Sequence, residues 1–290
     1  MEARAIIHTM ETLIAPFHLK LTDQGTLEEV HGKNLSTTAY SRMKYGVRTD
    51  LKQFAHALAK ELRIAAPQLY TDSRPPAMLT SYKASAPPAT TMARYCLDII
   101  NLERFKSGLV PGEMVRVYRP QDYIEEYAIL PVSERKKLIG DQSTNTLQGR
   151  DLTGYTPVII DDIHVTGTYT AMMRRVTEQY DNVVLAYLIV CDQTMKDSAD
   201  AEGKLNSSEI RKPSDLLPYI EKDDFVFTRR FLKMLLRSSV TEVRVVVGTI
   251  PDMLLEQIAR AIIDTDSELQ NIFPKTCKLI FDTAAKRHIF

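Results

Sequence analysis

Residues 156–170 read TPVIIDDIHVTGTYT, and this stretch decides the fold class. Its first five residues form a continuous apolar run without polar alternation. Such a strand is buried on both faces, which is typical of a parallel sheet covered by helices. Two acids and a turn rich in Thr and Gly follow, and a helical pattern then runs from about Tyr169 to Gln179. The stretch therefore predicts a strand, a turn and a helix of an α/β fold.

The segments on either side of this stretch repeat the alternation of strands and helices. Strands are predicted at residues 77–80, 115–118 and 183–190, and helices at about 50–64 and 88–105, the second opened by two prolines. Strands that alternate with helices in this way form a parallel sheet. The expected fold class is α/β, an open parallel sheet flanked by helices with a helical C-terminal extension.

The chain divides by pattern into three parts. Residues 1–45 are expected to have little regular structure and to form a hood, a segment that covers the ligand. Residues 46–195 form the core, and residues 196–290 are mainly helical, with residues 243–247 open between strand and helix. Residues 119–155 show no sustained period, and a structureless insertion of this length is either a functional lid or a solvated loop.

Composition excludes several classes of protein. The 290 residues include 37 Lys and Arg against 37 Asp and Glu, so the excess of positive charge that nucleic-acid binding needs is missing. No apolar run is long enough to span a membrane, and the N-terminus does not resemble a signal peptide. Three scattered cysteines indicate neither a disulfide framework nor a zinc site, and the default compartment is the cytoplasm. Cys96 and Cys191 lie in apolar patterns and are expected in the core.

The end of the central strand carries the chemistry. Asp161 and Asp162 lie where open α/β sheets bind ligands, and the following turn offers backbone N–H groups to an anion at a helix N-terminus. A phosphate cradle beside two carboxylates suits a sugar phosphate, with or without a magnesium ion at its hydroxyls. The glycine patterns of a Walker loop and of a dinucleotide site are both absent from the sequence.

These residues resemble the phosphoribosyl-pyrophosphate motif of the type I phosphoribosyltransferases: an apolar run, two acids, three variable residues and Thr-Gly. The segment 80–83, Thr-Ser-Tyr-Lys before a helix opened by prolines, is similar to the pyrophosphate loop of that family. Order and spacing agree over roughly residues 45–192. Within the family, residues 40–46 (YSRMKYG), 123–130 (YIEEYAIL) and 134–135 (ER) resemble proteins encoded in bacterial stress and tellurite-resistance gene clusters.

The resemblance implies a Mg²⁺-dependent enzyme that transfers the phosphoribosyl group from phosphoribosyl pyrophosphate to a nitrogenous base. It implies catalytic roles for Lys83, Asp161 and Asp162, with Lys83 and the metal stabilising the departing pyrophosphate. The acid pair would bind the ribose hydroxyls or the metal, directly or through water. The full set implied to bind phosphoribosyl pyrophosphate is Ser81, Tyr82, Lys83, Asp161, Asp162, Thr166, Gly167, Thr168, Tyr169 and Thr170.

Two positions depart from the family pattern. The family often has Gly where this chain has Thr168 and Thr where it has Tyr169, and Thr170 can supply the last phosphate contact instead. Val165 stands where purine-specific members carry a carboxylate that deprotonates the base. The acceptor base therefore cannot be read from the sequence.

Further candidates surround the motif. Arg116 and Arg119 can neutralise pyrophosphate or pair with an acidic lid, whose candidates for contact with the acceptor or the metal are Tyr123, Glu125, Glu126 and Tyr127. His164 is expected to be a satisfied or an exposed histidine rather than an acid or base. The basic residues Arg229, Arg230, Lys233 and Arg237 are expected to form a solvated helix face.

Two other functions compete with the enzyme. The same fold can sense phosphoribosyl pyrophosphate or a nucleotide without catalysis, with the C-terminal helices reporting occupancy to a partner. A phosphatase with Asp161 as its nucleophile ranks lower, because it would need two acids spaced by one residue and these are adjacent. The resemblance also implies a homodimer, which is common in the family.

Overall fold

The structure is a computed structural model. It describes residues 13–22, 27–30, 33–81, 87–117, 147–191, 198–264 and 268–290.

The described strands form one sheet. They are β1 (Leu13–Ile14), β2 (Phe17–Leu21), β3 (Leu27–Glu29), β4 (Pro76–Ser81), β5 (Glu113–Val117), β6 (Thr156–His164) and β7 (Val184–Cys191). Their order is β3-β2-β7-β6-β4-β5, with β1 also paired to β7. The antiparallel pair β2–β3 lies at one edge, and the other pairs are parallel.

Helices are interspersed with the strands up to β7, and the described chain after β7 contains helices and loops but no further strand of the sheet. They are α1 (Thr37–Tyr45), α2 (Arg48–Ala65), α3 (Gln68–Thr71), α4 (Pro88–Lys106), α6 (Thr168–Thr177), α7 (Ser198–Asn206), η1 (Pro213–Leu216), α8 (Leu217–Glu221), α9 (Arg229–Arg237), α10 (Val240–Thr249), α11 (Asp252–Ile263), α12 (Glu268–Ile272) and α13 (Pro274–Lys286). None of the helices in the described ranges is both long and apolar enough to cross a lipid bilayer.

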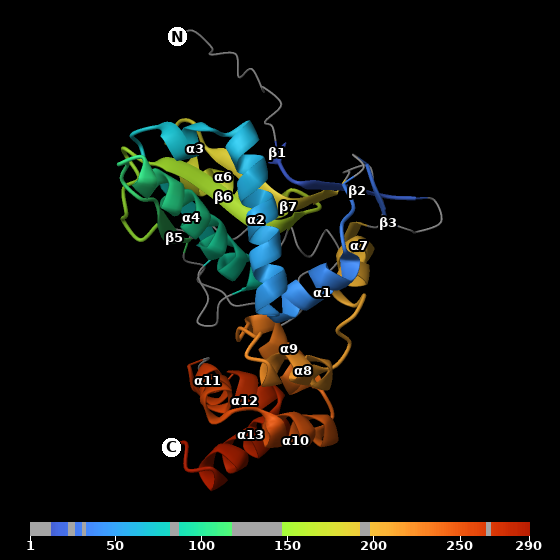
Figure 1. The fold of residues 1–290 in the computed structure, drawn as a ribbon. Helices are drawn as coiled ribbons and strands as arrows, with labels where there is room; N and C mark the ends of the chain where they lie inside the picture. The colour runs from blue at the N-terminus through green and yellow to red at the C-terminus, as the bar shows by residue number, and fades with distance from the viewer. Residues whose placement is uncertain are drawn as a thin grey trace, which may run out of the picture.

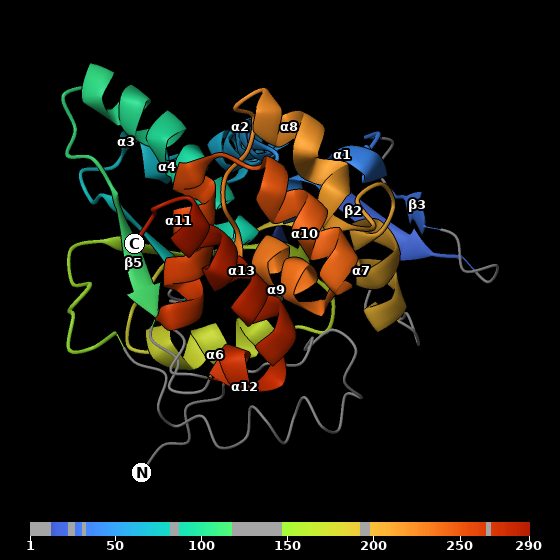
Figure 2. The ribbon, with the colours of Figure 1, turned by 90° about the horizontal axis from the view of Figure 1, so that it is seen from below.

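Helices cover both faces of the sheet (Figures 1 and 2). Met78 and Ile160 pack in a core with α1, α2 and α4, whereas Leu79 and Ile159 pack in a second core with α6. Neighbouring strand residues enter different cores because side chains alternate across a strand. The apolar runs of β4, β6 and β7 are therefore buried on both sides, and the predicted α/β fold class is confirmed.

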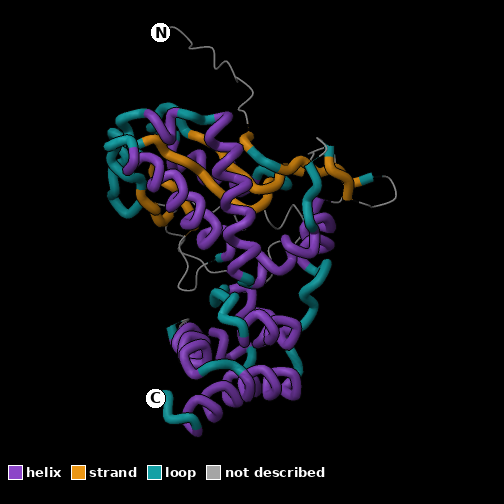
Figure 3. Tube along the Cα trace, in the orientation of Figure 1, coloured by secondary structure: helices purple, strands orange, loops and turns teal. Residues whose placement is uncertain are grey.

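The C-terminal helices have a core of their own. Buried residues of α9, α10, α11 and α13 pack together with Val47, at the junction of α1 and α2. Figure 3 shows this part of the molecule as helices and loops below the sheet. The helical character predicted for the C-terminal region is confirmed, and residues 243–247, left open in the sequence, lie within α10.

Two expectations from the sequence were wrong. The first 45 residues were expected to have little regular structure, but β1 and β2 extend the sheet beside β7 and α1 packs into the core. The strand predicted to end at Ile160 continues to His164, so both acids lie within β6. The division of the chain into hood, core and extension remains a prediction.

Gly46 ends α1 with a positive φ of 108°. A Cβ there would lie 2.2 Å from the carbonyl oxygen of Val226. We expect Gly46→Ala to lower the free energy of unfolding by about 2 kcal/mol or more, through backbone strain and the clash. The measurement is urea denaturation, with Gly248→Ala in α10 as the control.

The control removes a helical glycine whose Cβ would have no neighbour within 4 Å. It should be neutral or stabilising by up to about 1 kcal/mol. Equal effects of the two substitutions would show that the contact at Gly46 does not constrain the chain.

The three cysteines are buried, which confirms the prediction for Cys96 and Cys191. Burial raises the pKa of Cys96 and of Cys191 to about 12 and also raises the pKa of Cys277. At pH 8 the native protein should therefore not react with a thiol reagent such as dithionitrobenzoate, because the thiolate is the reacting form. All three thiols should react in urea, and rapid release of one equivalent from the native protein would contradict the buried placement.

Candidate functional site

The candidate site lies where the order of the strands reverses. The connection after β4 leads through α4 to β5 on one side, whereas the connection after β6 leads through α6 to β7 on the other. Because β4 and β6 are parallel neighbours, the ends of both strands lie at the same edge of the sheet. Ser81 therefore lies at the edge where Asp161 and Asp162 lie, and open α/β sheets bind ligands at this kind of switch point.

The turn after β6 leads directly into α6. Gly167 is the N-cap of the helix with a φ of 70°, a left-handed conformation that a glycine adopts without strain. Thr166 and Thr168 lie on either side of it, with their hydroxyl oxygens 2.8 Å apart. Free N–H groups and hydroxyls at a helix N-terminus favour an anion, so the predicted phosphate loop has a suitable geometry.

The two acids leave β6 on opposite sides, and their carboxyl groups are also hydrogen-bonded to each other. Asp162, only 5% exposed, faces α1, where its Oδ2 accepts a hydrogen bond of 2.8 Å from the Tyr40 hydroxyl and pairs with the Lys44 ammonium. Burial alone would raise the pKa of Asp162, but the Lys44 charge and both hydrogen bonds lower it below its usual value. Asp162 is therefore an ionised carboxylate whose Oδ2 already has two donors.

Asp161 lies on the opposite side of β6, half-buried, and its Oδ1 accepts the backbone N–H of Asp162 at 2.9 Å. Burial, together with the charge of Asp162, raises its pKa well above the usual value. The adjacent acids are thus unequal, because within the described part of the chain only Asp162 has a cation at hydrogen-bond distance.

Lys44 connects the acid pair to the C-terminal part of the chain. Its ammonium lies 3.4 Å from Glu202 of α7, and Glu202 lies 3.5 Å from Arg230 of α9. The Lys44 side chain is 7% exposed. Burial lowers the pKa of Lys44, but the two carboxylates outweigh it and raise the pKa overall, so the ammonium is charged.

The basic face predicted on α9 is therefore not entirely solvated. Arg229 is buried, and the guanidinium of Arg230 lies over the ring of Tyr45 at 5.8 Å as well as beside Glu202.

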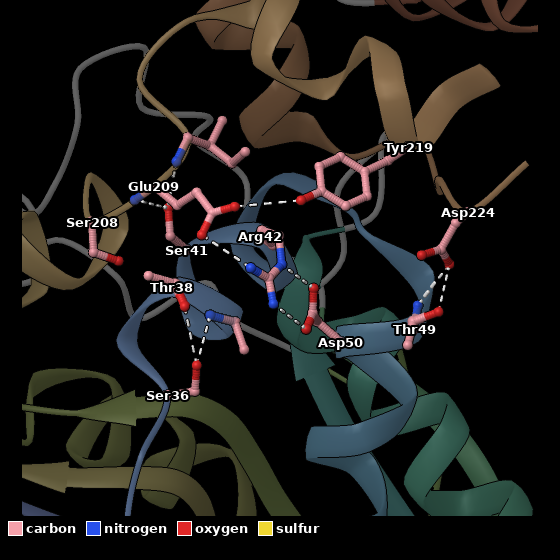
Figure 4. A network of polar contacts seen from close by, with 12 residues as sticks. Ser36, Thr38, Ser41, Arg42, Thr49, Asp50, Ser208, Glu209, Tyr219 and Asp224 are labelled. Carbon is pink, nitrogen blue, oxygen red and sulfur yellow. Dashed lines mark hydrogen bonds and ion pairs between the residues drawn. The ribbon is translucent and has the colours of Figure 1, made fainter. Parts of the chain in front are cut away.

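Residues 206–210 contact the other side of α1 (Figure 4). The Ser41 hydroxyl donates to the carbonyl of Asn206 at 2.6 Å and accepts the backbone N–H of Ile210 at 3.0 Å. Arg42 joins Asp50 at 2.8 Å and Glu209 at 3.0 Å. A helix of nine residues thus contacts the site acid on one side and the C-terminal part on the other.

His164 is neither satisfied nor exposed, contrary to the expectation. It is buried, with its ring edge-on to Tyr187 at 4.9 Å, and its Nδ1 has no hydrogen-bond partner among the described residues. Burial lowers its pKa, so the ring is neutral at pH 7. Tyr187 lies beside Asp161 in the strand register, and its hydroxyl is 2.6 Å from that of Thr170.

Some predicted site residues lie outside the described residues: Tyr82, Lys83, Arg119, Tyr123, Glu125, Glu126 and Tyr127. Arg116 is described, exposed on β5 next to the end of β4. The structure brings together Ser81, the two acids and the turn from Thr166 to Thr170 at one edge of the sheet.

The sequence analysis missed Tyr40, Lys44 and Tyr187 as residues of the site. The first two carried a signal, because residues four apart lie on the same face of a helix. Residues 40–46 resemble other proteins, but nothing in that resemblance indicates that Tyr40 and Lys44 reach the acid pair.

A hollow of ≈ 510 Å³ lies away from this site. It is lined by Leu147, residues 149–151, Tyr180 and the C-terminal end of α6, whereas the candidate site lies at the N-terminal end of that helix.

Comparison with known proteins agrees with the architecture. The family model described as PRTase ComF-like matches residues 26–273, a range that includes α1, the acid pair and most of the C-terminal helices. The comparisons with curated proteins and with solved structures gave no match. Because the family model covers well over half of the chain, the protein belongs to the PRTase ComF-like family of phosphoribosyltransferase-type proteins.

Proposed function

We propose that the protein transfers the phosphoribosyl group of phosphoribosyl pyrophosphate to a nitrogenous base. In this reaction a ring nitrogen forms a bond to C1 of the ribose, and the bond from C1 to the pyrophosphate oxygen breaks with its electron pair leaving on pyrophosphate. The observation that carries the proposal is the placement of an acid pair, a helix N-terminus with hydroxyls and the end of β4 at one switch point.

Each group has a role that fits its chemistry. Asp161 and Asp162 accept hydrogen bonds from the ribose hydroxyls, and the turn from Thr166 to Thr170 binds the 5′-phosphate. The loop that begins at Ser81 binds the pyrophosphate, with Lys83 stabilising its charge. Positive charge develops on the ribose as pyrophosphate leaves, and in this proposal the buried, ionised carboxylate of Asp162 stabilises that charge.

The acid pair fits a magnesium ion only in part. Oδ2 of Asp162 already has two donors, Tyr40 and the Lys44 ammonium. The described residues contain no group of three or more His, Cys, Asp or Glu side chains that could hold a metal. Mg²⁺ prefers substrate phosphates together with one or two carboxylates. We therefore propose that the ion arrives bound to the pyrophosphate of the substrate, where it neutralises the leaving group.

The alternative function is a sensor that binds the same ligand without catalysis. Its specific support is the contact between Lys44 and Glu202, through which the acid pair touches the C-terminal helices. Ligand binding at the acids could change the Lys44–Glu202 contact and thereby the position of α7 and of Arg230 in α9. Release of pyrophosphate separates the two functions, since a sensor binds the ligand and leaves it intact.

Calorimetry of phosphoribosyl pyrophosphate with Mg²⁺ tests the site. We expect binding to the wild type and at least about threefold weaker binding to Asp161→Asn. The substitution replaces a carboxyl oxygen by an amide NH₂, which cannot accept a hydrogen bond from the ribose, and one such bond contributes about 0.5–1.5 kcal/mol. Asp282→Asn, at an exposed ion pair on α13, is the matched control and should bind as the wild type does.

A screen for pyrophosphate release with purine and pyrimidine bases then decides between enzyme and sensor. Absence of binding to the wild type would contradict the proposed function, and unchanged binding to Asp161→Asn would contradict the role of the acid.

The unequal environments of the two acids predict opposite effects on stability. Asp162→Asn leaves Lys44 with Glu202 alone and should lower the free energy of unfolding by about 3 kcal/mol or more. Asp161→Asn should be neutral or stabilising at pH 7, because an acid whose pKa is raised by folding destabilises the folded state once it is ionised. Urea denaturation at pH 7 measures both, and a larger loss in Asp161→Asn would contradict the assignment.

A further inference from the structure

The feature that the proposed function leaves unexplained is the ammonium of Lys44. It lies within α1, away from every segment that the motif predicts, and yet it contacts an acid of that motif. We propose that Lys44 is the fixed cation of the acid pair, so that the hydroxyl-bearing end of a ribose phosphate binds at Asp161 and Asp162 without a metal ion. The inference rests on the proposed function and specifies how its site is charged.

The first argument is the balance of charge. Two adjacent carboxylates repel each other and repel a phosphorylated ligand, unless a cation lies beside them. Lys44 provides this cation at hydrogen-bond distance from Asp162. A divalent ion placed directly on Asp162 would in turn be repelled by the ammonium a few ångströms away.

The second argument is the distribution of donors and acceptors. Tyr40 and Lys44 both donate to the same oxygen of Asp162, Oδ2. Oδ1 of Asp161 accepts the backbone N–H of Asp162, which leaves the second oxygen of each acid without a donor from Tyr40, Lys44 or that N–H. A ribose carries two neighbouring hydroxyls, each of which donates one hydrogen bond. The remaining oxygens match such a donor pair in kind.

The third argument is that Lys44 is held in place. Its side chain is 7% exposed, and Glu202 lies 3.4 Å from the ammonium as a second carboxylate partner. Arg230 lies beside Glu202, and its guanidinium is placed over the ring of Tyr45. The charges of the four groups Asp162, Lys44, Glu202 and Arg230 sum to zero. The ammonium is therefore part of the folded framework, unlike an ion that exchanges with solvent.

Ribose 5-phosphate tests the hydroxyl and 5′-phosphate contacts by themselves, because it has no pyrophosphate to bind Mg²⁺. We expect its dissociation constant for the wild type, measured by calorimetry, to agree within twofold between EDTA and Mg²⁺. Phosphoribosyl pyrophosphate is titrated in parallel and should bind more tightly with Mg²⁺.

Variants test the source of the charge. Lys44→Met should weaken binding of ribose 5-phosphate in EDTA at least tenfold, and Mg²⁺ should restore part of the loss. Tyr40→Phe keeps the ammonium, so its binding should remain independent of the metal even where it is weaker. Lys278→Met, which removes an exposed lysine on α13, is the control and should bind like the wild type.

The outcomes distinguish this inference from the proposed function. If ribose 5-phosphate requires Mg²⁺ in the wild type while the pyrophosphate ligand binds, Lys44 is not the cation of the site and the proposed function stands. If neither ligand binds, both are overturned. Wild-type affinity in Lys44→Met also overturns the inference. Should Lys44→Met fail to fold in a thermal unfolding control, the metal dependence of ribose 5-phosphate binding in the wild type and in Tyr40→Phe still tests the inference. A requirement for Mg²⁺ in either protein would overturn it.

Discussion

A lysine ammonium buried beside a carboxylate is the interaction on which the arrangement of the molecule depends. A charge removed from water is costly unless it is paired, so α1 must lie where Lys44 reaches Asp162. The same requirement places Glu202, and with it α7, against α1. One pair of charges thereby fixes an N-terminal helix, the central strand and the start of the C-terminal helices relative to one another.

Because side chains alternate along β6, the two acids leave the strand on opposite sides and have different neighbours. Asp162 belongs to the face shared with α1, where it is paired and ionised, and Asp161 belongs to the face shared with α6, where it lies near Tyr187. Two carboxylates that look equivalent in a sequence motif thus differ in pKa, exposure and partners. Such a pair can combine a fixed structural anion with an acceptor that responds to the ligand.

The sequence predicted the elements whose signal is local. The apolar run before Asp161 and the Thr-Gly turn after it identify β6 and α6, because burial on both faces and a left-handed N-cap leave a pattern in neighbouring residues. Helix α1 escaped prediction because its buried face includes Ser41 and Lys44, polar residues whose partners lie elsewhere in the chain. Hydrophobic periodicity cannot detect a face buried through polar contacts.

The distance along the chain between α1 and its partners also shapes how the protein folds. Lys44 and Asp162 are 118 residues apart, and Ser41 donates to the carbonyl of Asn206 across 165 residues. During synthesis α1 emerges early, but its polar contacts form only after most of the chain has left the ribosome. Contacts of such long range slow folding. The N-terminal helix is therefore expected to dock late, as a closing step that joins the sheet to the helices behind it.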